Sequence, residues 1–372
     1  MFPTPTDADP RPTAERNADH GHLPLLIALR ALAALIILWH HYALYPPLRE
    51  WAAPLLGDTL DWLAQHARAT QVFFVLGGYV MARSMEARQW GWRQTGMFVA
   101  QRYCRLGLPY LGAIALVIPA YTFARGWLPD AVLGEPVSLP QLLAHLFFLQ
   151  DILGYEPLSA GLWFVCINFQ LCLIYVTCLW LRDNIGQGST DFVGLVGWTL
   201  ALVSLFHFNL DAAGWDRWAL YFFPYFFMGI IVHRALAGGT RRVEFWLYLA
   251  AITAAMVFEW RWRLAIAAPV GLLLLTAELS GFSARWPRSR LLARLGEVSF
   301  SLFLVHFPIL IWVAAFWARM GWNSPGAAVA GLAAAFVASI VGALLFHRWI
   351  EIPAAQISGR RGPSVRRLAY QA

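Results

Sequence analysis

Residues 23–47 read LPLLIALRALAALIILWHHYALYPP and hold the features on which the fold assignment depends. Three ionisable side chains, Arg30, His40 and His41, interrupt a segment that is otherwise predominantly apolar. As a helix, the segment is long enough to cross a hydrocarbon layer about 30 Å thick. Similar segments recur through the rest of the chain, so we expect an all-α, polytopic membrane protein.

We expect about ten transmembrane helices, and we expect the last of them to end at Pro353. The apolar segments lie at 24–45, 69–84, 104–124, 160–181, 191–209, 217–233, 243–258, 262–279, 297–317 and 326–347. The shorter stretch Leu142–Ile152 is not long enough to span, and we expect an interfacial or re-entrant helix there.

Composition supports this fold class. Of 372 residues, 59% are hydrophobic and 13% are charged, and the mean hydropathy is +0.55. Soluble proteins average about 45–50% apolar and about 25% charged residues. The balance excludes a soluble globular enzyme, a disordered chain and a nucleic-acid-binding protein with a basic patch. All 28 basic residues are arginine, which excludes lysine-based chemistry, and the four cysteines have no metal-site spacing, so we expect no metal.

Arginine distribution predicts the orientation. With the N-terminus in the cytoplasm, 21 of the 28 arginines fall on the cytoplasmic side and seven on the other side. The positive-inside rule then favours cytoplasmic N- and C-termini with an even number of spans. We expect a disordered cytoplasmic tail at 1–22, a membrane domain at 23–353 and a basic cytoplasmic tail at 354–372.

Ionisable residues inside apolar segments indicate where function lies, because lipid exposure penalises them. Arg30 and His41 are eleven residues apart, which places them on one helical face about 16 Å apart along the axis. An arginine that reaches lipid phosphate and a structural histidine would give the same pattern.

Further polar residues follow in later segments. Arg102 and Arg105 share a face where the third span is expected to open to the cytoplasm, and neighbouring guanidinium groups suit phosphates. His306 is a proton carrier or a buried structural imidazole. His347 and Glu351 are four residues apart and face the same way, which also suits a helix-end ion pair. Together these residues predict an internal polar cavity.

The chain resembles the acyltransferase-3 family of integral membrane O-acyltransferases over about residues 24–353. Six segments match the family pattern in order: Arg30 with His41, FFVLGGYV at 73–80, Arg102 and Arg105 with Pro109, Leu162–Val165, SFSLFLVH at 299–306, and Trp349–Pro353. Two positions depart from the pattern. Gly77 replaces a serine, and Asn168 stands where bacterial O-antigen acetylases carry glutamate, so we do not expect the substrates of that branch.

The resemblance implies transfer of an acyl group, in the first instance acetyl, from cytoplasmic acyl-CoA to a hydroxyl of a glycan, glycolipid or small metabolite. It implies no nucleic-acid partner, and a location in the bacterial cytoplasmic (inner) membrane. Arg102 and Arg105 are then expected to hold coenzyme A phosphates.

The expected catalytic roles follow from the same resemblance. His41 is the general base or carries the acyl group transiently. Arg30 supports a charged donor group or a partner carboxylate. Glu351 holds an arginine or His41 in place, and His306 handles protons.

Two other classes of function explain part of the pattern. A transporter or flippase for a lipid-linked or anionic solute would also need many spans and a polar cavity, but we find no paired repeats or corresponding broken helices. A non-enzymatic membrane assembly factor would not depend on the buried ionisable groups.

Overall fold

The computed structural model describes residues 24–129, 133–185, 191–210, 212–287 and 289–359. The expected tail at 1–22 and residues 360–372 of the expected basic tail lie outside this part. Regular secondary structure in the described residues is entirely helical. The helices are α2 (Pro24–Leu44), α3 (Leu48–His66), α4 (Thr70–Met85), α5 (Trp92–Ala124), α7 (Leu139–Leu146), α8 (Leu162–Asn184), α9 (Phe192–Val203), η1 (Ser204–Phe208), α10 (Ala212–Trp215), α11 (Ala219–Ala235), α12 (Thr240–Phe258), α13 (Trp262–Leu279), α14 (Phe282–Arg285), α15 (Arg290–Glu297), α16 (Ser299–Arg319), α17 (Pro325–Phe346), η2 (His347–Glu351) and α18 (Ile352–Gly359).

Each of the ten apolar segments forms a helix, and the short stretch before α8 contains α7. Within the described residues, six helices are long and apolar enough to cross a membrane by length and composition. They are α2, α5, α8, α13, α16 and the continuous helix formed by α17, η2 and α18. Apolar helices at Phe192–Phe208 and Ala219–Ala235 are shorter. The chain is therefore an all-helical, multi-pass membrane protein.

The third apolar helix is longer than expected. It begins at Trp92 rather than at 104 and has 33 residues, or about 50 Å. Residues 92–103 contain enough polar side chains that their hydropathy does not indicate a membrane helix. They contain no proline that would interrupt the helix. Arg102 and Arg105 consequently lie two to four turns inside α5 and not at the start of a helix.

The last helix does not end at Pro353, contrary to expectation. After α17 the chain forms the π-helical turn η2, in which the Ile352 amide donates to the His347 carbonyl five residues earlier. Pro353 follows directly after this turn, as the second residue of α18. The wider turn changes the direction in which Glu351 projects, and π-turns of this kind are common at functional sites.

Helix α3 was not expected, because its sequence mixes apolar residues with Glu50, Asp58 and Asp61. It packs against α2 and α17. Its other side is exposed, including Leu55 and Trp62. The arrangement is that of an amphipathic helix, which has one apolar side and too little total hydrophobicity to resemble a span.

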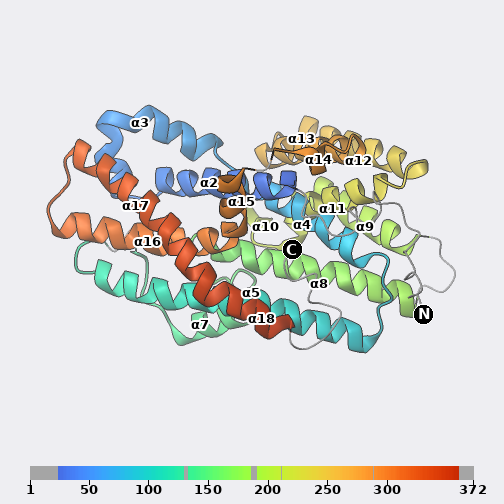
Figure 1. Cartoon of the computed structure of the whole chain (residues 1–372), viewed down its shortest axis with the longest axis horizontal. Helices are drawn as coiled ribbons and strands as arrows, with labels where there is room; N and C mark the ends of the chain where they lie inside the picture. The colour runs from blue at the N-terminus through green and yellow to red at the C-terminus, as the bar shows by residue number, and fades with distance from the viewer. Residues whose placement is uncertain (1–23, 130–132, 186–190, 211, 288, 360–372) are drawn as a thin grey trace, which may run out of the picture.

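The buried core has two parts, and both α2 and α8 contribute to each of them. One part is built mainly by α4, α11, α12 and α13, and the other mainly by α3, α5, α16 and α17. Figure 1 shows α3, α16 and α17 toward one end of the long axis and α12 and α13 toward the other, while α5 runs along much of its length. The boundary between the two parts of the core is where the polar residues predicted from the sequence gather.

Candidate active site

Helix α2 reaches two cavities with residues of one face. Arg30, in its first half, lines a cavity of ≈ 90 Å³, and His41, in its last turn, lines another of ≈ 450 Å³. We call these the arginine cavity and the histidine cavity. The two residues lie eleven positions apart, as the sequence shows. The helix is continuous between them, as the prediction of a single face requires, and the two side chains meet different spaces.

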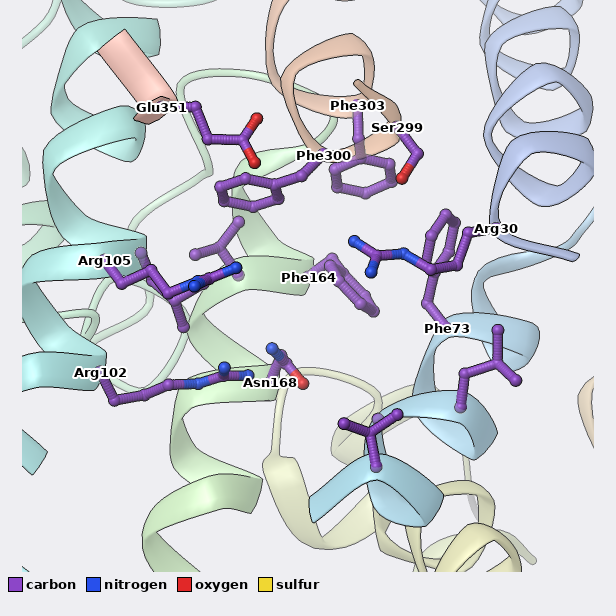
Figure 2. A pocket seen from close by; sticks show the side chains of 15 residues that line it. Arg30, Phe73, Arg102, Arg105, Phe164, Asn168, Ser299, Phe300, Phe303 and Glu351 are labelled. Atoms are coloured by element: carbon purple, nitrogen blue, oxygen red, sulfur yellow. The ribbon is translucent and has the colours of Figure 1, made fainter. Parts of the chain in front are cut away.

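The arginine cavity lies at the boundary between the two parts of the core. Its lining residues come from α2, α4, α5, α8, α16 and η2: Arg30, Phe73, Leu76, Gly77, Val80, Arg102, Arg105, Leu106, Phe164, Val165, Asn168, Ser299, Phe300, Phe303 and Glu351. Figure 2 shows the guanidinium groups of Arg30, Arg102 and Arg105 directed into one space from opposite sides. Three cations and one carboxylate give the lining a formal charge of +2, which favours an anionic ligand.

Arg102 carries a second sign of ligand binding. Its side chain is buried, and its Nε has no hydrogen-bond partner among the described residues. Buried polar atoms are almost always satisfied in native proteins, so an orphaned donor beside a cavity suits an anion that completes it.

Glu351 is held by two neighbours. Ser301 donates a hydrogen bond of 2.6 Å to its Oε2, and His347 Nδ1 lies 2.9 Å from the same oxygen. The expected same-face pair of His347 and Glu351 is therefore confirmed. Glu351 does not contact His41, which was one of its two expected partners, because the arginine cavity and the last turn of α2 are at different depths. Its carboxylate faces the space that the arginines enter (Figure 2).

The histidine cavity has a different electrostatic character. Its lining includes His40, His41, the three arginines Arg68, Arg217 and Arg263, and the three acidic residues Asp151, Glu156 and Asp216. Arg217 forms an ion pair of 3.1 Å with Glu156. Equal numbers of cations and carboxylates, together with the Trp163 and Phe222 rings, make a space suited to a neutral polar ligand with hydroxyl groups.

Asp151 lies outside the spans, and among the titratable groups of this cavity there, its pKa is the one that burial changes most clearly. Burial raises the pKa of its carboxyl from 3.8 to about 6, while Arg217 opposes the shift. Gln150 donates a hydrogen bond of 2.9 Å to the carboxylate. The sequence analysis did not find Asp151, because it lies in a turn between α7 and α8 where no periodic pattern marks it.

His41 is paired with His306, a contact that joins α2 to α16. His41 Nδ1 lies 2.7 Å from His306 Nε2, and the two rings are nearly parallel, with an interplanar angle of 6°. Both side chains are buried. His306 lines neither cavity, so it reaches ligands only through His41.

Three phenylalanine rings line the arginine cavity on the side that reaches the histidine pair. Phe73, Phe164 and Phe303 line the arginine cavity and contact one another, with ring centroids 5.1 to 6.2 Å apart. Phe303 also approaches the His306 ring at 6.1 Å. This phenylalanine cluster therefore extends from the arginine cavity to the ring of His306.

The comparison with protein families links this geometry to a known group. A family model described as an acyltransferase domain matches residues 24–348. The chain belongs to the acyltransferase-3 family. No match was found among curated proteins, and none among solved structures.

The acyltransferase-3 motifs noted in the sequence converge on one place. Each of the six segments supplies at least one residue to the arginine cavity, among them Arg30, Gly77, Arg102, Phe164 and Glu351. The remaining segment, at the start of α16, contributes Ser299 to the lining. The two departures from the pattern also meet there, because a Cβ added at Gly77 would lie 3.6 Å from Asn168 Oδ1. The structure thus brings the predicted Arg30, Arg102, Arg105 and Glu351 together, and places His41 with His306.

Proposed function

We propose that this acyltransferase-3 protein is an O-acyltransferase that takes an acyl group, in the first instance acetyl, from cytoplasmic acyl-CoA. The acceptor is a hydroxyl of a glycan, glycolipid or small metabolite. The observation that supports this most is the convergence of all six family segments on a small cavity with three arginines, beside a larger cavity that contains a buried histidine pair.

Charge and size assign the donor to the arginine cavity. Coenzyme A carries several phosphate charges, and a lining with a formal charge of +2 attracts them. Arg102 and Arg105 hold phosphate oxygens. Arg30, which interacts electrostatically with Glu351, stabilises negative charge on the donor from the opposite side of the cavity. The arginine cavity is the narrower of the two, at ≈ 90 Å³ against ≈ 450 Å³ for the histidine cavity, which suits the thin pantetheine arm. The pantetheine arm extends from there through the phenylalanine cluster toward His41.

The acceptor enters the histidine cavity, whose ≈ 450 Å³ and balanced polar lining suit a hydroxylated molecule. We orient the protein with ten spans and both termini in the cytoplasm, so that the histidine cavity faces the outer side of the bacterial cytoplasmic membrane. The donor and acceptor then approach His41 from opposite sides of the bilayer.

In the transfer step, His41 removes the proton of the acceptor hydroxyl while the oxygen attacks the thioester carbonyl carbon. A carbon–oxygen bond forms, the carbon–sulfur bond breaks, and the leaving thiolate takes the proton from His41. The products are an ester and free coenzyme A. If His41 first carries the acyl group, its nitrogen replaces the hydroxyl as the attacking atom and the acceptor attacks in a second step.

The test uses purified protein, radiolabelled acetyl-CoA and longer acyl-CoA donors, and a total glycan and lipid extract as acceptor. Wild type is compared with His41→Ala and with His66→Ala, since His66 is an exposed histidine of α3. We expect label in the extract with wild type and His66→Ala, and none with His41→Ala. Full transfer by His41→Ala would refute the role of His41.

A further inference from the structure

The geometry points to His306 as a positioning residue that fixes the tautomer of His41 and leaves Nε2 of His41 as the reacting nitrogen. This deepens the proposed function and rests on it for what that nitrogen does. The tautomer itself follows from hydrogen bonds in the structure.

The hydrogen bonds form a chain of three groups. The Leu302 carbonyl oxygen lies 3.0 Å from His306 Nδ1, and His306 Nε2 lies 2.7 Å from His41 Nδ1. The Leu302 carbonyl and His306 are one turn apart on α16, whereas His41 belongs to α2. The chain of hydrogen bonds therefore connects the two helices.

Donor and acceptor chemistry then assigns the protons. A carbonyl oxygen only accepts, so His306 Nδ1 carries a hydrogen. In the neutral ring, Nε2 of His306 is unprotonated and accepts. The hydrogen between the two rings consequently belongs to His41 Nδ1, and Nε2 of His41 is left with a free lone pair.

A charged pair would reverse this assignment, but the surroundings disfavour it. Both rings are buried, and the rings that contact them are His40, Tyr45 and Phe303. The three carboxylates that share the histidine cavity with His41 are matched there by three arginines. Among the described residues, no carboxylate forms an ion pair with either ring, and a buried imidazolium without such a partner is costly. The neutral pair is therefore the resting state.

The assignment explains how a histidine without an acidic partner acts as a base. In serine hydrolases a carboxylate holds the histidine tautomer, and loss of that group lowers kcat about 10⁴-fold although the geometry is kept. Here the Leu302 carbonyl and His306 hold the tautomer of His41 without a buried negative charge. When His41 takes up a proton at Nε2, His306 is placed to share the positive charge.

The first test reads the tautomer without any activity. Protein labelled with ¹⁵N-histidine gives imidazole nitrogen shifts that separate protonated from unprotonated nitrogens, and a His41→Gln spectrum identifies the His41 signals among the ten histidines. We expect a protonated Nδ1 and an unprotonated Nε2 in wild type. The opposite pattern overturns the proposal.

The second test separates positioning from packing. In His306→Gln, the side-chain oxygen reaches the place of Nε2 and still accepts from His41, whereas His306→Leu fills the space without an acceptor. We expect kcat within about tenfold of wild type for the glutamine variant and a loss of roughly 100-fold or more for the leucine variant. KM for acetyl-CoA stays unchanged in both, because His306 lines neither cavity.

Equal kcat values for the two variants would overturn the proposal, because a packing role does not distinguish an acceptor from a methyl group. A thermal unfolding midpoint for each variant shows that it is folded, and the wild-type spectrum decides the tautomer if the leucine variant is not. Absence of acyl transfer by wild type would refute the proposed function alone, since the spectrum still reports on the His306 contact.

Discussion

Two adjacent glycines of α4 give a sharp test of how this fold is held together. Gly78 lies against the backbone of α11, where an added Cβ would overlap the Phe226 carbonyl oxygen and lie 2.8 Å from its carbonyl carbon. Gly77 faces Asn168 Oδ1 at 3.6 Å and the Phe226 ring at 3.7 Å, which are ordinary contacts. We therefore expect Gly78→Ala to destabilise the protein and Gly77→Ala to leave its stability unchanged or slightly higher.

The magnitude follows from the helix contact. The backbone of Phe226 cannot rotate away from a new methyl group, so α4 and α11 must separate by more than about 1 Å to clear the Phe226 carbonyl oxygen. A gap of 0.5–1 Å loses roughly a quarter to a half of the dispersion energy at the contact, and overpacking typically costs about 1–3 kcal/mol. Both variants gain the same helix propensity, about 1 kcal/mol. The difference between them should reach about 3 kcal/mol.

The assay is thermal unfolding in detergent, followed by the fluorescence of the 19 tryptophans. Gly78→Ala should unfold several degrees below Gly77→Ala. Equal midpoints, or a lower midpoint for Gly77→Ala, would show that the close contact between α4 and α11 does not govern stability.

Two further predictions concern the cavities. Arg102→Ala should raise KM for acetyl-CoA about tenfold or more, because a charge-assisted hydrogen bond contributes about 1.5–3 kcal/mol. Arg93 is an exposed arginine of the same helix, and Arg93→Ala should leave KM unchanged. An unchanged KM for Arg102→Ala excludes the phosphate role. Asp151→Asn should raise the unfolding midpoint at pH 7.5 and much less at pH 4, because burial raises the pKa of Asp151 from 3.8 to about 6 in the folded protein, so the free-energy cost of ionising this carboxyl grows between these two values and is complete above about pH 6. Asp58→Asn, in exposed α3, is the control, and an equal gain at both pH values contradicts the buried ionisation.

The sequence predicted much of the arginine cavity because its residues lie on regular helices. The eleven-residue spacing of Arg30 and His41 and the three-residue spacing of Arg102 and Arg105 define helical faces without knowledge of the partners. The four-residue spacing of His347 and Glu351 marked the carboxylate, and the order of the family segments added Gly77 and the others. Their convergence on one cavity then required only that these helices pack together.

Other features depend on contacts that no local pattern encodes. His41 and His306 are 265 positions apart, so their pairing is set by how α2 and α16 pack. Asp151 and Arg217 of the histidine cavity lie outside regular spans. The start of α5 and the helix α3 were missed because their polar residues conceal them from hydropathy.

The most direct test of the central claim is the sidedness of acyl transfer. Radiolabelled acetyl-CoA is added to sealed inside-out and right-side-out vesicles from the same cells, so that the donor meets only one face and the acceptors are those of the membrane itself. We predict esterified label in inside-out vesicles with wild type, and none in right-side-out vesicles or with His41→Ala. Equal labelling in both orientations, or label that accumulates inside the vesicles as intact acetyl-CoA, would contradict transfer across the membrane at His41.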